Sequence, residues 1–139
     1  MQTKEEEPPQ KRTVRLGKLF IQEFPTYSKA MQNAINDVRN TFMDHGLEKS
    51  KYKGKIRNSW TGTKIAANKA FTKANNLRHI HLGVPDFSLS PNGKYYTSDY
   101  VLHFQYDPST PNDIRFIKAT PHYSTNPKRF NLPTEHCLQ

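Results

Sequence analysis

Histidines are concentrated in the second half of this chain, on segments whose residue pattern predicts β-strands. His79 and His81 are two residues apart, so both side chains leave the same face of one predicted strand. Asp99 and His103 belong to the next predicted strand, and His122 directly follows the third. If the three strands pair in register, these side chains converge in one patch.

A patch of this kind holds the groups that metal-independent cleavage of RNA requires. The reaction needs a base to take the ribose 2′-OH proton, an acid to protonate the 5′-oxygen, and cations to hold the charge on the phosphate. Histidine fits both proton-transfer roles because its pKa lies near neutrality. Arg78 and Lys118 are close to the histidines in the sequence and fit the third role, and Tyr100 can orient a base or the phosphate.

Other interpretations of the same residues stay open. His103 can be a surface histidine or a buried one with satisfied hydrogen bonds, since titration near neutrality alone is no sign of a role. The H-x-H pair can also be two zinc ligands, with His122 and Asp99 completing the set. The single cysteine, Cys137, has only His136 beside it and no evident orienting carboxylate, which argues against a nucleophile.

The chain is basic, and much of the positive charge falls in one segment. Its 139 residues include 21 Lys and Arg against 12 Asp and Glu, a formal net charge of +9. Between Glu48 and Arg78 there are nine cations and one carboxylate. Five of these cations alternate strictly with other residues: Lys49, Lys51, Lys53, Lys55 and Arg57. In an extended segment all five would point the same way, and with the interleaved aromatic residues Tyr52, Trp60 and Phe71 they would grip RNA. A solvated loop is the alternative.

Length and composition exclude several classes of protein. No stretch approaches the roughly 20 apolar residues that a membrane span needs, and no apolar signal segment lies near the start. One cysteine makes an intramolecular disulfide impossible. Neither a phosphate-cradling glycine loop nor G-x-S-x-G is present. We therefore expect a cytoplasmic protein with one domain, no membrane association and no cofactor.

The first half of the chain predicts a strand followed by a long helix. Residues 1–12 are polar and are expected to form a disordered leader. Residues 13–24 predict a strand with a glycine bulge. Residues 27–45 predict an amphipathic helix, with Thr26 as its N-cap and Gly46 as its stop.

The second half predicts a weaker helix and then an antiparallel meander. The helix is expected at residues 64–75, and the strands at residues 77–82, 95–106 and 114–119. This order indicates a single α+β domain over residues 13–122, with helices packed on one face of a small antiparallel sheet and the other face open. Residues 123–139 are expected to be a polar tail or a short helix.

The meander resembles the sheet of the RelE superfamily of bacterial toxins, and within it the YafO type most closely. R-H-I-H-L at residues 78–82 is similar to the H-I-H-L strand of YafO-like proteins. I-R-F-I-K-A-T-P-H at residues 114–122 is similar to their last strand, which closes in P-x-P-H or its equivalent. S-D-Y-V-L-H-F at residues 98–104 is similar to the D-W-[IV]-L-I-Y strand of YafQ-like members, with Tyr100 in place of the tryptophan. The likeness covers roughly residues 13–122.

The resemblance implies an mRNA interferase, the toxin of a toxin–antitoxin pair. Such a protein has a RelE-like fold and cuts messenger RNA by metal-independent attack of the 2′-OH, in YafO-like members on the translating ribosome. Its partners would be mRNA, the ribosome and a cognate antitoxin. By position, His79 and His81 match the histidine strand, Asp99 and Tyr100 match the D-W pair, and His122 matches the histidine after the last strand.

Together, the residues and the resemblance assign a role to each candidate. His122 is the expected general acid or base, and His79 and His81 supply the partner proton role or contact the phosphate. Asp99 would orient a histidine, and Tyr100 would contact a base. Two other classes remain: a non-catalytic RNA- or DNA-binding protein that uses the same basic surface, and a structural or inhibitory phage or plasmid protein whose charge serves a protein partner.

Overall fold

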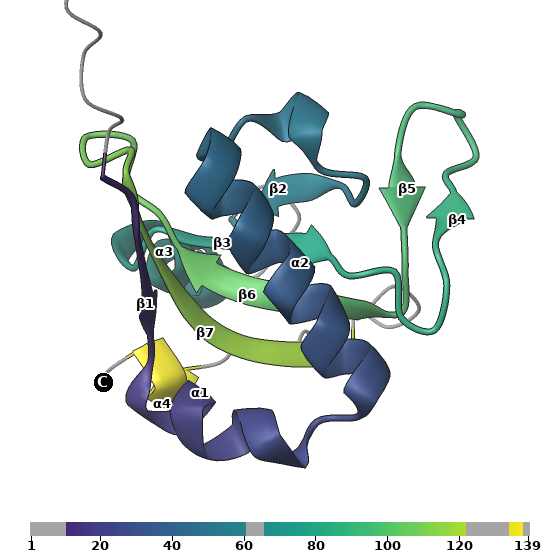
Figure 1. Ribbon diagram of the computed structural model, residues 1–139. Coiled ribbons are helices and arrows are strands. Elements are labelled where there is room, and N and C mark those ends of the chain that lie inside the picture. Colours follow the sequence, from purple (N-terminus) through teal and green to yellow (C-terminus); the bar gives the residue numbers. More distant parts are fainter. Residues whose placement is uncertain (1–10, 61–65, 122–133, 138–139) are drawn as a thin grey trace, which may run out of the picture.

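A five-stranded sheet runs through the middle of the molecule (Figure 1). The structure is a computed structural model, and it describes residues 11–60, 66–121 and 134–137. The strands, in their order across the sheet, are β1 (Thr13–Leu16), β7 (Asp113–Pro121), β6 (Tyr100–Gln105), β3 (Leu77–His81) and β2 (Ile56–Asn58). A separate hairpin contains β4 (Ser88–Leu89) and β5 (Tyr96–Thr97). The helical elements are α1 (Lys18–Glu23), η1 (Phe24–Thr26), α2 (Lys29–His45), η2 (Lys49–Lys51), α3 (Ala66–Ala74) and α4 (Thr134–Cys137).

The fold is α+β as expected, but the sheet is mixed. β1 runs parallel to β7, whereas β2, β3, β6 and β7 pair with one another antiparallel. A purely antiparallel sheet was therefore the wrong prediction. The parallel pair is possible because α1, α2, α3 and the five strands β2 to β6 separate β1 from β7 in the chain, and parallel strands need a long connection.

Helices cover both faces of the sheet, so the prediction of one open face is also wrong. α2 crosses the front of the sheet in Figure 1, and α3 lies behind it. The front cluster includes Phe20, Met31, Ile35, Phe42, Ile80, Leu102 and Phe116. The rear cluster contains Leu77, Ile117 and Cys137, with Phe71 of α3 packed against it. Burial of consecutive residues in β3 and β6 follows from this double cover.

The chain turns from strand to helix at Gly17, where the sequence predicted a continuous strand with a bulge. Gly17 has extended backbone angles, and its N–H donates to the carbonyl of Phe116 in β7. Its own carbonyl accepts from the N–H of Ile21, which starts the helical pattern of α1. The helix buries Phe20 to 2% exposure and leaves Ile21 55% exposed. The helix has only six residues, and over so short a stretch the spacing of apolar residues does not distinguish a helix from a strand.

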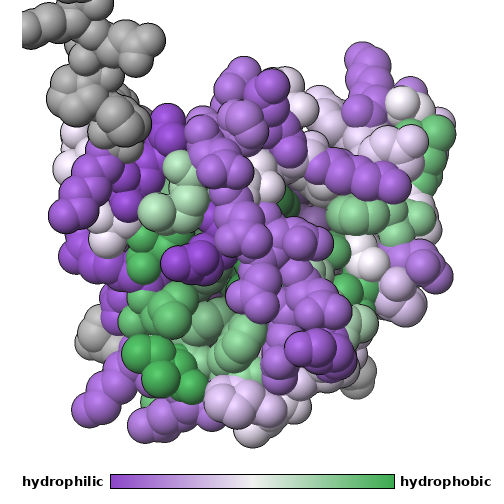
Figure 2. All heavy atoms as spheres, in the orientation of Figure 1, coloured by the Kyte–Doolittle hydropathy of each residue, from purple (hydrophilic) through white to green (hydrophobic). Residues whose placement is uncertain are grey.

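The long helix forms close to its predicted position. Its N-cap is Ser28, whose side chain accepts a hydrogen bond from the N–H of Met31 at 3.2 Å. Thr26 instead belongs to the preceding 3₁₀ turn. The predicted stop at Gly46 is confirmed: its φ is +66°, and its N–H donates to the carbonyl of Phe42. Figure 2 shows that the exposed face of α2 is hydrophilic, whereas a hydrophobic patch lies beside it over α1 and β1.

The predicted strand at residues 95–106 is divided into β5 and β6, and only β6 belongs to the main sheet. β5 pairs with β4 in a hairpin that stands to one side of the sheet (Figure 1). The turn of this hairpin is confirmed by the N–H of Gly93, which donates to the carbonyl of Ser90. The expected leader at residues 1–12 and helix at residues 64–75 fall partly outside the described residues, as does the tail, of which α4 is described.

Replacing Phe20 by alanine should lower the free energy of unfolding by about 3–5 kcal/mol, because a buried aromatic ring leaves the core. Ile21→Ala is the matched control on the same helix, and we expect a change of about 0.5 kcal/mol or less at this exposed position. Urea denaturation followed by circular dichroism measures both effects. A larger loss for Ile21→Ala than for Phe20→Ala would contradict the observed turn of α1.

Candidate histidine site and basic groove

Strand register places two histidines between two cations in a row across the sheet. Arg57 of β2 is the direct partner of His79 in β3, His79 is the partner of His103 in β6, and His103 is the partner of Lys118 in β7. Side chains at directly paired positions leave the same face of a sheet. We call this set, Arg57, His79, His103 and Lys118, the histidine row.

His81 lies beside the row on the same face, two residues along β3 from His79. The ring centroids of His79 and His81 are 6.1 Å apart, and those of His79 and His103 are 6.2 Å apart. The structure therefore brings together His79, His81 and His103. In-register pairing of the strands was the condition stated for His103 to join this patch, although no catalytic role was assigned to it.

Each of the three rings is buried and oriented by hydrogen bonds. His79, His81 and His103 are 6%, 5% and 2% exposed. The Nδ1 atom of His79 lies 3.0 Å from the hydroxyl of Ser59, and the Nε2 atom of His103 lies 2.7 Å from the hydroxyl of Thr120. A hydroxyl can donate or accept, so either tautomer of these two rings can be held in place.

The backbone of Ser98 holds His81. Its N–H and its carbonyl oxygen lie 2.8 and 3.0 Å from Nδ1 of His81. The N–H donates to an unprotonated Nδ1 and the carbonyl accepts from a protonated one, so the same backbone can hold either form of the ring. The Ser98 hydroxyl donates to the carbonyl of Tyr100 and accepts from the N–H of Gly83, which fixes this turn. Asp99, the predicted orienting carboxylate, has an exposed side chain just before β6.

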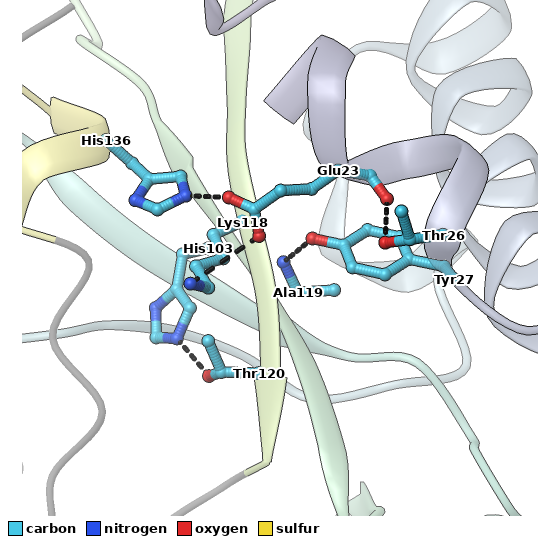
Figure 3. Close-up of polar contacts among 8 residues, drawn as sticks. All are labelled: Glu23, Thr26, Tyr27, His103, Lys118, Ala119, Thr120 and His136. Carbon is cyan, nitrogen blue, oxygen red and sulfur yellow. Dashed lines mark hydrogen bonds and ion pairs between the residues drawn. The ribbon is translucent and has the colours of Figure 1, made fainter. Parts of the chain in front are cut away.

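Lys118, at one end of the histidine row, is paired with a carboxylate. Its Nζ lies 3.5 Å from Glu23 of α1, and the same carboxylate bonds to Nε2 of His136 in α4 (Figure 3). Next along β7, the N–H of Ala119 donates to the hydroxyl oxygen of Tyr27 at 3.2 Å. Burial raises the pKa of Tyr27, so its hydroxyl stays neutral. Glu23 thus joins α1, α4 and β7 beside the row.

Two other predicted site residues lie on the opposite face of the sheet. Arg78 lies on the same face of β3 as Ile80, two residues away. Its guanidinium stacks on two rings: the guanidinium carbon lies 5.3 Å from the ring centroid of Trp60 and 5.5 Å from that of Tyr106. Tyr100 packs against the cluster beneath α2. The sheet therefore separates both side chains from the histidine row. His122, the predicted acid or base, lies outside the described residues.

The five alternating cations do not form one extended stripe. Residues Lys49–Lys51 make the 3₁₀ turn η2, in which the N–H of Lys51 donates to the carbonyl of Glu48. Tyr52 then turns inward, packs against the core and donates its hydroxyl hydrogen to the carbonyl of Gly46 at 2.7 Å. Tyr52 itself has extended backbone angles, so η2 is the part of the segment that departs from an extended stripe.

Four of these five cations nevertheless line one groove, together with residues of the hairpin. The groove has a volume of about 730 Å³. Its cations are Lys49, Lys53, Lys55, Arg57 and Lys94, and its aromatic residues are Tyr52, Tyr95 and Tyr96. Lys51 lines a separate pocket against α2. We call the first of these the basic groove. The sequence did not single out its hairpin residues, because no local pattern places β5 beside the segment before β2.

Within residues 11–60, 66–121 and 134–137, no group of three or more His, Cys, Asp or Glu side chains is arranged to hold a metal ion. In the same part of the chain, no helix has the length and apolar character to cross a membrane.

The chain has no match among protein-family models, curated proteins or solved structures. Its α+β fold and the positions of its histidines and cations therefore carry the functional argument.

Cys137 is expected to be an unreactive thiol. It is the only cysteine in the chain, and burial raises its pKa to about 11. Compared with a thiol whose pKa is near 9, the thiolate fraction of Cys137 at pH 8 is about 100-fold lower. Because the thiolate is the reactive form, alkylation is slowed by the same factor. Iodoacetamide at pH 8 should alkylate the native protein at least that much more slowly than the urea-unfolded protein, with mass spectrometry as the readout. Equal rates in the two states would contradict the packing of α4 on the sheet.

Proposed function

We propose that the chain is an endoribonuclease toxin with a RelE-like fold, which cleaves messenger RNA through attack of a ribose 2′-OH on the adjacent phosphate. The observation that carries the proposal is the histidine row, Arg57, His79, His103 and Lys118, on four adjacent strands. Two groups able to transfer protons near neutral pH lie between two cations able to hold a phosphate.

In the proposed reaction the two imidazoles share the proton transfers. One takes the proton of the 2′-hydroxyl as its oxygen bonds to phosphorus, and the other donates a proton to the 5′-oxygen as the P–O5′ bond breaks. The products are a 2′,3′-cyclic phosphate and a 5′-hydroxyl, and the step consumes no co-reactant. His79 and His103 are the pair we favour. His81 and His122 remain candidates for the same roles, and Asp99 remains a candidate orienting group.

Access to the row is part of the proposal. The rings of His79, His81 and His103 are 2–6% exposed, and α3 and α4 pack on their side of the sheet. RNA can reach the imidazoles only when part of this cover moves. The bond between Glu23 and His136 attaches α4, one part of this cover, to α1.

The partners in the proposal come from the resemblance to RelE-superfamily toxins. They are messenger RNA on the ribosome and a cognate antitoxin protein, in the cytoplasm, with no metal or other cofactor in the cleavage step. The basic groove supports the RNA part, because it carries five cations and no carboxylate in its lining.

A non-catalytic RNA- or DNA-binding protein is the second candidate. It is favoured by the burial of the histidines, which a structural role for all three rings would also explain. It uses the basic groove in the same way but needs no acid or base. The two candidates differ in one result, namely whether replacing a histidine removes cleavage while RNA binding persists.

The test is primer extension on a defined message, with and without ribosomes, for the wild type and two histidine variants. His79→Asn retains a polar group near the Nδ1 position that faces Ser59, and His103→Gln retains one near the Nε2 position that faces Thr120. Each variant should cleave roughly 10²–10⁴-fold more slowly, the usual contribution of a general acid or base. His45→Gln, at the exposed end of α2, is the matched control and should cleave at the wild-type rate.

Thermal unfolding of each variant separates a chemical defect from a folding defect. Loss of cleavage with an unchanged melting temperature supports the catalytic role. Wild-type protein that leaves the message intact both with and without ribosomes, while still binding it, would favour the binding protein instead. Cleavage at the wild-type rate by His79→Asn and His103→Gln would exclude these two histidines as acid and base.

A further inference from the structure

We infer that the basic groove is a stacking site for unpaired nucleotides of an RNA strand, with bases on Tyr95 and Tyr96 and phosphates on Lys53 and Lys55. The inference rests on the proposed function for the identity of the strand as the RNA substrate. It names the residues that would hold this substrate beside the site of cleavage.

The two walls of the groove come from parts of the chain far apart in sequence. One wall is the segment from η2 to β2, and the other is the hairpin residue Lys94 with Tyr95 and Tyr96. The backbone joins the walls: the N–H of Lys55 donates to the carbonyl of Tyr96 at 2.9 Å, and the N–H of His81 donates to the carbonyl of Lys55 at 3.1 Å. The segment before β2 is thereby fixed between β3 and β5.

Gly54 permits this close approach. A Cβ atom at this position would lie 1.9 Å from the carbonyl oxygen of His81 and 3.1 Å from the ring of Phe87. Any side chain here would push the segment away from β3 and open the groove. The positions of Lys53 and Lys55, on either side of Gly54, are therefore set by the backbone before a ligand arrives, which reduces the cost of ordering them on binding.

The aromatic rings are placed as stacking surfaces. Tyr95 and Tyr96 are 44% and 41% exposed, although each is a large apolar ring. The ammonium of Lys55 lies 4.3 Å from the centroid of Tyr95, and that of Lys53 lies 5.1 Å from the centroids of both Tyr96 and Phe87. A base stacks on an aromatic ring more strongly than an exposed ammonium does. A base that stacks on a tyrosine displaces the lysine ammonium from that ring, and the ammonium can then pair with a phosphate of the same strand.

Charge and ring exposure together favour a single-stranded nucleic acid over a protein. The lining contains five cations and no Asp or Glu, so a polyanion fits it. Acidic peptides share the charge but offer no planar groups for the exposed tyrosines. A duplex keeps its bases stacked inside, so only unpaired nucleotides can use both the rings and the lysines.

Arg57 connects the groove to the histidine row. It lines the groove and is also the direct strand partner of His79. An RNA strand that stacks on Tyr95 and Tyr96 and continues past Arg57 therefore reaches the edge of the sheet beside the histidines. The groove would hold nucleotides on one side of the phosphate that is cleaved.

The test measures fluorescence anisotropy with a labelled 2′-O-methyl oligonucleotide, which lacks the attacking hydroxyl and cannot be cleaved. Tyr95→Leu and Tyr96→Leu should each weaken binding roughly 5- to 100-fold, whereas the corresponding phenylalanine variants should bind like the wild type. Leu89→Ala, at an exposed position of the same hairpin outside the groove, is the matched control and should leave affinity unchanged. Replacing both Lys53 and Lys55 by glutamine should reduce the salt slope of log K by roughly 1.4.

A measurement on the wild-type protein keeps the test independent of how the variants fold. An oligonucleotide of the same length with abasic positions should bind at least roughly 5-fold more weakly, because phosphates remain but stacking is lost. Equal affinity for the abasic strand, for a duplex or for polyglutamate of equal charge would overturn the inference. So would unchanged affinity in folded Tyr95→Leu and Tyr96→Leu variants.

Failure of the groove can be distinguished from failure of the proposed function. If binding depends on the bases but no form of the protein cleaves RNA, the groove proposal stands and the nuclease proposal is rejected. If cleavage depends on His79 or His103 but the Tyr95 and Tyr96 variants bind RNA like the wild type, the nuclease proposal stands and the groove proposal is rejected.

Discussion

Burial of β3 and β6 on both faces is the constraint on which the candidate site depends. A strand covered on both sides has no solvent to satisfy a polar side chain, so each buried imidazole needs partners within the protein. The hydroxyls of Ser59 and Thr120 and the backbone of Ser98 supply them. These partners also fix the orientation of the rings, which is what a proton-transfer site needs before any substrate arrives. Stability and the proposed chemistry therefore make the same demand on this part of the sequence.

The same double cover explains which features could be predicted from the sequence. Alternation in β3 placed His79 and His81 on one face, because the side-chain period of a strand is independent of what covers it. The long apolar stripe of α2 and its stop at Gly46 were equally local signals. The helix at residues 64–75 was predicted, but the face that it covers was not, because no local pattern says on which side of a sheet a helix packs through residues such as Phe71.

Long-range pairing was the part that local patterns could not supply. The row from Arg57 to Lys118 depends on the relative register of four strands, and a bulge between His103 and Phe104 shifts the last pairing. The basic groove depends on a contact between Gly54 and Tyr96, more than forty residues apart in the chain. The alternating lysines indicated where the charge lies. They gave the wrong geometry because the 3₁₀ turn η2 interrupts the extended segment that was expected to carry them.

Under the proposed function, the residues that bind RNA would be separate from those that cleave it. The cations of the basic groove are accessible at the edge of the sheet, whereas the imidazoles are buried behind it, and Glu23 draws Lys118 toward α1. The ion pair of Lys118 with Glu23 holds α1 against β7, so Lys118 has a structural role in either candidate function. A nuclease whose imidazoles stay covered until the strand is seated would cut only RNA that first occupies the groove. Arg57 belongs to both sets, so an RNA strand held in the groove would lie nearest to the histidine row at that side chain.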